Sequence, residues 1–237
     1  MPSNVGEAVI RRATSLDLKV EPYTWPFARE RRGEIEAHFT AKKRERAGIW
    51  NGRVLLARNA SFEGLRFSAR YFETDFASFL AWRDWGFPDR DVFNGFSMGA
   101  LRASDGAFLL GEMSAHTANA GRIYFPAGTP DPDDISGDAF DAAGSMTREI
   151  EEETGLTQAD YTAAPHWDCV AVGASIAMIR LLDLAMSGEV ARAKIMAHLA
   201  RQTRPELSAI HLVFGPPDLT AQMPRFVTAF IEHQMKA

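Results

Sequence analysis

The stretch "REIEEETGL", residues 148–156, carries four glutamates in nine positions and ends in glycine and leucine. If it forms the last turns of a helix, at about 100° per residue, Glu149, Glu152 and Glu153 share one face. Gly155 suits the left-handed position that terminates a helix, and Leu156 can pack back beneath it. The carboxylates then lie at the helix C-terminus, where the dipole disfavours anions. A hard divalent cation such as Mg²⁺ or Mn²⁺ would relieve both this and the mutual repulsion.

The same helix is predicted to carry a separate apolar stripe about a quarter turn away, formed by Ala139, Ala143, Met146 and Ile150. One side could therefore dock on a core while the other points into a cleft. Acid spacing alone leaves an alternative open, because glutamate-rich helices that end in glycine are common solvated surfaces. The choice between a metal site and a solvated face needs further residues.

The residues that favour a metal site form a pattern that resembles a known family signature. "REIEEETGL" resembles the second half of the Nudix box, the Arg-Glu-aliphatic-x-Glu-Glu-x-Gly-aliphatic signature of Nudix hydrolases, at every specified position. Upstream, "IYFPAGTPD", residues 123–131, is similar to the strand and Pro-x-Gly turn that open that box. The resemblance implies an α+β fold, a Nudix-type α/β/α sandwich with a mixed sheet. It covers residues 92–237 and is absent from residues 1–91.

The first half of the box departs from the family pattern. The separation between Gly128 and Arg148 is longer than usual, so residues are inserted between them. Counted back from Arg148, the position of the expected glutamate is held by Phe140, and Gly137-Asp138 is a candidate replacement for the Gly-acid pair. In the family this acid braces the loop and is not a core metal ligand, so the departure leaves the predicted metal ligands in place.

Carried over residue by residue, the resemblance implies that Glu152 and Glu153 bind divalent ions, Mg²⁺ or Mn²⁺. Glu149 would join them or act as general base. Arg148 would hold the carboxylates in place through charge-assisted hydrogen bonds.

Two further metal contacts follow from the same resemblance. The backbone carbonyl near Ala127 or Gly128 often completes the metal shell in this family. Members also recruit one more acid from a later loop, and Glu206, just before "LSAIHLVF", is the best-placed candidate. The alternative for Glu206 is an ordinary charged residue at the start of a strand.

The implied activity is hydrolysis of a nucleoside diphosphate linked to another moiety, by attack of a metal-activated water on the pyrophosphate. A faint similarity of "IWNGRVLLAR" and "YFETDFASFLAW" to N-terminal extensions of some Nudix proteins places nucleotide sugars slightly ahead of other dinucleotides. Two alternatives stay open. The domain could bind a nucleotide without cleaving it, as a sensor, or the N-terminal module could act as a scaffold.

Periodicity and turn residues predict two units, an N-terminal module over residues 1–91 and the Nudix-like domain over residues 92–237. In the first, residues 26–50 read as a surface helix, 53–58 and 65–72 as a strand pair, and 74–89 as a helix capped by Thr74 or Asp75. In the second, residues 95–104 and 106–114 read as a strand pair, followed by a strand near 121–128. Residues 166–172 and 206–214 are predicted strands, 188–202 is a helix, and a closing helix over 218–234 is interrupted near Pro224; residues 175–184 fit either a strand or a buried helix.

The charge, cysteine content and apolar runs of the chain exclude several classes of protein. The formal charge of −5 offers no general attraction to nucleic acid or anionic lipid, so nucleic acid is not an expected partner. The single cysteine, Cys169, cannot form an intramolecular disulfide, which fits a reducing cytoplasm. The longest apolar run, "CVAVGASIAMI", is too short to span a bilayer, and no export signal is expected. A homodimer is compatible with the family, but no residue of the sequence requires one.

Overall fold

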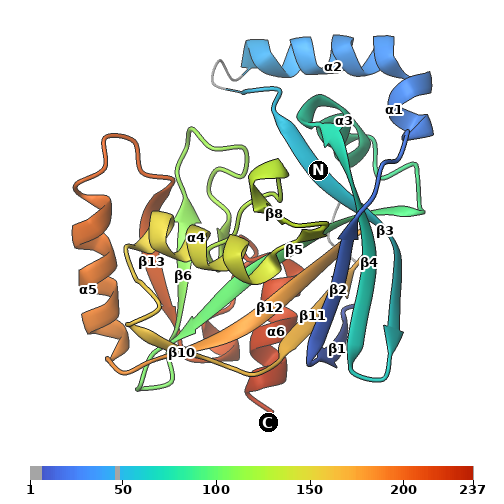
Figure 1. Ribbon diagram of the computed structural model, residues 1–237. Coiled ribbons are helices and arrows are strands. Elements are labelled where there is room, and N and C mark those ends of the chain that lie inside the picture. The colour runs from blue at the N-terminus through green and yellow to red at the C-terminus, as the bar shows by residue number, and fades with distance from the viewer. Residues whose placement is uncertain (1–6, 46–48, 237) are drawn as a thin grey trace.

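The computed structural model describes residues 7–45 and 49–236 (Figure 1). Its helices are α1 (Pro26–Glu30), α2 (Arg32–Glu45), α3 (Phe76–Asp84), α4 (Ala142–Thr154), α5 (Gly188–Leu199) and α6 (Arg225–Gln234). Its strands are β1 (Val9–Ala13), β2 (Ser15–Val20), β3 (Arg53–Glu63), β4 (Arg66–Asp75), β5 (Val92–Arg102), β6 (Phe108–Met113), β7 (Ile123–Tyr124), β8 (Ile135–Ser136), β9 (Ala139–Phe140), β10 (Tyr161–Ala163), β11 (Trp167–Val172), β12 (Ser175–Leu184) and β13 (Leu207–Val213). The predicted α+β class with a mixed sheet is confirmed.

Strand β5 organises the sheet. Strand β12 runs parallel to it along one edge, from Ser175 opposite Asn94 to Asp183 opposite Arg102. Strand β3 and strand β6 share the other edge, at its start and its end respectively. The predicted antiparallel pairing of β5 with β6 is confirmed but short, at Arg102 opposite Phe108, because β6 then continues away from β5 and pairs along its length with β13.

Helices α4 and α6 cover opposite faces of this sheet. On one face, Gly99 of β5 lies against Ile150 of α4. On the other, Phe96 of β5 packs edge-on against Phe226 of α6, with ring centroids 5.4 Å apart. Because side chains alternate along a strand, residues 96 and 99 must point to opposite sides. Figure 1 shows α4 in front of these strands and α6 behind them, which gives the α/β/α layering that was predicted.

The N-terminal region is joined to the rest of the chain by strand pairing and by a shared core. Strand β1 pairs antiparallel with β11, from Val9 opposite Ala171 to Ala13 opposite Trp167. Leu18, Leu55 and Tyr71 belong to the same buried cluster as Ile150 and Val170. A second cluster, which includes Trp25, Phe72 and Trp82, joins α1, α2 and α3 to β3 and β4. The division into 1–91 and 92–237 remains a prediction.

Several predicted elements differ in detail. The helix predicted over residues 26–50 is divided at Arg31 into α1 and α2. Residues 46–48 lie outside the described residues, and residues 49–50 are not helical, so the helix ends before its predicted bound. Residues 175–184 form strand β12, which settles the alternative between strand and helix. The strand predicted near 121–128 is reduced to the two residues of β7. The closing helix begins only after Pro224, which has no backbone N–H to continue an earlier turn.

Strands β1 and β2 were not predicted, although Leu16, Leu18 and Val20 alternate with polar residues in β2 as a half-buried strand requires. Among the helices of residues 7–45 and 49–236, none has the length and apolar character needed to cross a bilayer.

Candidate metal centre

Helix α4 supplies the frame of the site. Asp141 caps its start by accepting a hydrogen bond from the Gly144 N–H (2.9 Å). Gly155 ends it in the left-handed conformation predicted from the sequence, with φ 68° and its N–H bonded to the Glu151 carbonyl. Leu156 is fully buried, as predicted. The three predicted carboxylates thus occupy the last two turns of the helix.

The buried side of α4 matches the predicted apolar stripe only in part. Met146 and Ile150 are buried, whereas Ala143 is exposed. Ala139 belongs to strand β9, because the helix begins only at Ala142. Ala142 is buried in the core in place of Ala143, which the prediction had put there.

The acidic side chains come together around one cavity of about 370 Å³. It is lined by Glu149, Glu152 and Glu153 of α4, by Glu206 on the connection between α5 and β13, and by His198 and Gln202. Glu149 and Glu153 are buried, while the Glu152 side chain keeps 62% of its surface exposed. The structure therefore groups the four predicted acids, and it adds two residues, His198 and Gln202, that the sequence did not single out.

Glu153 is the most constrained member of the cluster. The residue is only 4% exposed, and neither carboxylate oxygen has a hydrogen-bond partner. Burial raises its pKa well above the ordinary value, and the nearby Glu149 and Glu206 raise it further; the Ala127 backbone, which comes near without reaching hydrogen-bond geometry, offsets this only in part. A buried carboxylate without a partner is costly, so this site favours either a proton or a cation beside Glu153.

Glu149 has a similar but milder environment. Burial is the largest cause that raises its pKa to about 7, and the neighbouring carboxylates act in the same direction. Arg148 opposes them, since its Nη1 atom lies 2.8 Å from Glu149 Oε1. A carboxyl group with a pKa near neutrality can take up or release a proton at working pH.

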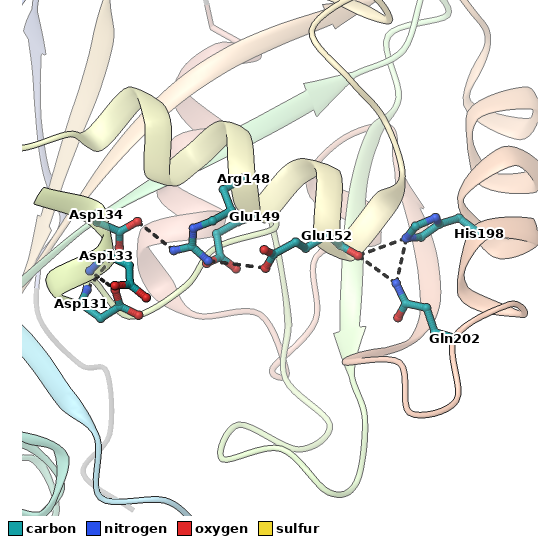
Figure 2. A network of polar contacts seen from close by, with 8 residues as sticks. All are labelled: Asp131, Asp133, Asp134, Arg148, Glu149, Glu152, His198 and Gln202. Carbon is teal, nitrogen blue, oxygen red and sulfur yellow. Dashed lines mark hydrogen bonds and ion pairs between the residues drawn. The ribbon is translucent and has the colours of Figure 1, made fainter. Parts of the chain in front are cut away.

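Arg148 links the acidic cluster to the loop that precedes α4 (Figure 2). Its Nη2 atom donates to Asp134 Oδ1 at 2.8 Å, and its Nη1 atom lies 3.5 Å from Glu152 Oε2. The Asp134 side chain is almost completely buried and also accepts the Asp131 N–H (3.2 Å). Arg148 thus holds Glu149 from a fixed anchor, as the family pattern implies.

Asp134 was missed by the sequence reasoning, which considered Asp138 for the bracing role. Asp138 instead forms an exposed ion pair with Lys19 (2.8 Å), and Phe140 is buried against Tyr71. The extra residues of the loop form the small hairpin β8–β9, residues 135–140, which lies between Asp134 and α4. Counting forward from Gly128 would have avoided this hairpin and pointed to Asp134.

Replacing Asp134 with Asn is expected to destabilise the protein by about 1–3 kcal/mol, because it removes the charged partner of a hydrogen bond to Arg148. The free energy of unfolding in denaturant measures this directly. The matched variant Asp138→Asn should leave stability close to that of the wild type, since its ion pair is solvent-exposed. Equal effects of the two substitutions would contradict the bracing role of Asp134.

Gly128 lies directly against Glu149. An added Cβ would overlap the Glu149 carboxylate, lying 2.6 Å from its Cδ atom. Gly128 is not among the glycines with positive φ, so glycine is needed here for close approach and not for backbone conformation. The turn at Gly128 therefore lies beside the acidic helix, as the expected metal contact of its backbone requires.

A Gly128→Ala protein is expected to fold and to lose up to about 10²-fold in metal-dependent turnover, because the Glu149 carboxylate must move aside. Steady-state kinetics at saturating Mg²⁺ would measure the loss. Gly33→Ala is the control, since an added Cβ there meets no atom within 4 Å. An unchanged rate in Gly128→Ala would argue against a catalytic position for Glu149.

The cluster is suited to a hard divalent ion in its chemistry, although its side chains are not arranged as a closed cage. Across residues 7–45 and 49–236, no three His, Cys, Asp or Glu side chains converge closely enough to hold a metal ion as they stand. The buried oxygens of Glu153, which have no protein partner, nevertheless offer ligands. Glu152 and Glu206 are exposed and can rotate toward them. Carboxylate oxygens are the donors that Mg²⁺ and Mn²⁺ prefer.

Comparisons with known proteins find only distant likenesses. No protein-family model matches this sequence, and a search of curated proteins finds no significant match. Among solved structures, a MutT protein from Methanosarcina mazei is 18% identical and covers 61% of this chain and 94% of its own, with a TM-score of 0.35. RenU, a Nudix hydrolase from M. smegmatis, is 15% identical over 60% of this chain and 82% of its own, with a TM-score of 0.36.

A third similar structure is a bifunctional NMN adenylyltransferase/ADP ribose pyrophosphatase from Francisella tularensis, in complex with AMP and a manganese ion. It is 13% identical over 65% of this chain and 44% of its own, with a TM-score of 0.39.

Proposed function

We propose that this protein is a divalent-metal-dependent hydrolase of the Nudix type, which cleaves the pyrophosphate bond of a nucleoside diphosphate linked to another moiety. The observation that carries the proposal is Glu153, buried beside Glu149 with both carboxylate oxygens unpaired. A purely structural helix would gain nothing from burying an unpartnered acid. A site that receives a cation would use it.

Glu149, Glu152, Glu153 and Glu206 are the side chains that would hold the ions, with the backbone at Gly128 beside them. When bound, Mg²⁺ or Mn²⁺ supplies neutralisation of the phosphate oxygens and activation of water. Arg148 keeps Glu149 in position through the contact at 2.8 Å. This arrangement suits an anionic substrate, which the acidic cavity alone would repel.

In the proposed reaction, a water oxygen forms a bond to one phosphorus as the bond from that phosphorus to the bridging oxygen breaks. The proton of the water passes to a base, and Glu149 is suited to this because its pKa lies at about 7. The bridging oxygen leaves with the second phosphate. The products are a nucleoside monophosphate and the phosphorylated second moiety.

Nucleotide sugars are the first substrates to test, because of the similarity of the N-terminal segments to extensions in Nudix proteins that act on them. The experiment is a panel of nucleoside diphosphate compounds incubated with Mg²⁺ or Mn²⁺, with phosphate release measured after phosphatase treatment. Metal-dependent cleavage of at least one compound, lost in Glu152→Gln, is the expected result. Nucleotide binding without cleavage would instead favour a sensor, and neither binding nor cleavage would favour a scaffold.

A further inference from the structure

Two side chains, His198 near the end of α5 and Gln202 just beyond it, contact the same backbone carbonyl near the end of α4 (Figure 2). Gln202 Nε2 donates to the Glu152 carbonyl oxygen at 2.9 Å. His198 Nε2 lies 3.1 Å from that oxygen and 2.8 Å from Gln202 Nε2. The three groups lie together at the C-terminal end of the acidic helix, and the single Nε2 atom of His198 completes one of its two contacts as a hydrogen bond, by donating to the carbonyl or by accepting from Gln202. We refer to His198 and Gln202 as the α5 clamp.

The α5 clamp provides a hydrogen-bond donor for a backbone carbonyl at the end of α4. The last carbonyls of an α-helix have no partner within the helix. The Gly155 N–H satisfies the Glu151 carbonyl, and the clamp satisfies that of Glu152. Donors directed at this end of the helix also oppose its negative dipole, beside the carboxylates that the dipole disfavours.

The position of His198 also depends on a glycine of the motif. A Cβ added to Gly155 would lie 2.5 Å from His198 Nδ1 and 2.6 Å from its Cγ. Glycine at this position therefore serves the left-handed turn and also lets the imidazole ring approach the backbone. The contact between α4 and α5 is specified from both sides.

The clamp connects to the fourth acid through the chain itself. Gln202 and Glu206 both lie on the connection between α5 and β13. The far end of this connection is bound to Ser114, whose N–H donates to the Glu206 carbonyl (2.8 Å) and whose hydroxyl donates to the Pro205 carbonyl (2.8 Å). The near end is bound to α4 by Gln202. Glu206 is thus held between two fixed points.

We propose that His198 and Gln202 are positioning residues which hold Glu206 against the acidic end of α4, so that the metal site is assembled across two segments of the chain. The inference rests on the proposed function. In this view the α5 clamp determines how far Glu206 lies from Glu149 and Glu153, which line the same cavity. Neither clamp residue needs to touch the metal or the substrate.

The test is a double-mutant cycle that measures Mn²⁺ affinity by titration calorimetry in the absence of substrate. Gln202→Met keeps the length of the side chain but removes the donor, and is expected to weaken Mn²⁺ binding about tenfold or more, as loss of an outer partner of a metal ligand does. In a Glu206→Gln background the same substitution should have little further effect, because its action passes through Glu206. Arg201→Met, an exposed neighbour, is the control.

A second variant keeps the test independent of one substitution. His198→Phe retains a ring against Gly155 but has no donor, and the same weakening and the same dependence on Glu206 are expected. Two results would overturn the inference but not the proposed function. One is that the clamp variants weaken Mn²⁺ binding in the Glu206→Gln background as much as in the wild-type background, and the other is that they leave Mn²⁺ affinity unchanged in the wild-type background. A wild-type protein that binds no Mn²⁺ would overturn the proposed function itself.

Discussion

A Glu153→Gln protein is expected to lose about 10²- to 10³-fold in metal-dependent turnover, the size of effect seen when a main electrostatic contact at a reaction centre is removed. In the absence of metal it should be at least as stable as the wild type. The reason is that Glu153 is buried with no hydrogen-bond partner, so a neutral side chain of the same shape loses no protein contact and has a smaller desolvation cost. Turnover and thermal unfolding, measured on the same preparation, therefore should change in different directions.

The control lies two residues earlier on the same helix. Glu151→Gln makes the same change in charge, but Glu151 is exposed and does not line the cavity that holds Glu149, Glu153 and Glu206. It should leave both turnover and stability near wild-type values. If the two variants lose turnover equally, the effect comes from the net charge of the helix and not from a metal ligand. If Glu153→Gln unfolds at a much lower temperature, Glu153 has a structural role that the described contacts do not include.

The parts of the site that could be predicted from the sequence are those determined by local geometry. The spacing of Glu149, Glu152 and Glu153 places them on one side of any α-helix, and Gly155 marks its end whatever surrounds it. Both features were read from nine consecutive residues, and both are present in α4. Which acid is buried could not be predicted, because burial depends on the strand and loop that pack against the helix.

The parts that were missed depend on contacts distant in sequence. The parallel alignment of β5 with β12 joins residues about eighty positions apart, and no local pattern fixes that register. The hairpin β8–β9 is inserted between Asp134 and Arg148, so their separation along the sequence is longer than the family pattern expects, although the two side chains are in contact. His198 and Gln202 reach Glu152 only because α5 packs beside α4. A histidine near the end of a helix and a glutamine just beyond it give no signal of that contact.

The metal-free protein is expected to lose stability as the pH rises from 5 to 8, and Mg²⁺ or Mn²⁺ should reverse this trend. Burial raises the pKa of Glu149 from the ordinary 4.5 to about 7 in the folded state. A carboxyl group with a raised pKa stabilises the fold fully at a pH below its unfolded value, and that contribution disappears as the pH rises through the folded value. For Glu149 alone the change is roughly 3 kcal/mol. Glu153 has the same sign.

Denaturant unfolding in the presence of a chelator, at several pH values between 5 and 8, measures this dependence. Asp75 and Asp160, whose pKa values are lowered, act only near and below their ordinary value of 3.8, so they do not mask it. Glu149→Gln should flatten the dependence by its own share and leave that of Glu153. Added Mn²⁺ should stabilise most at pH 8, because ions bind carboxylates that have lost their protons, and protons compete for the same oxygens at pH 5. Stability that rises with pH in the chelated wild type would mean that Glu149 and Glu153 are ionised and paired in the folded protein, and the metal site would then have no unpaired acid to receive a cation.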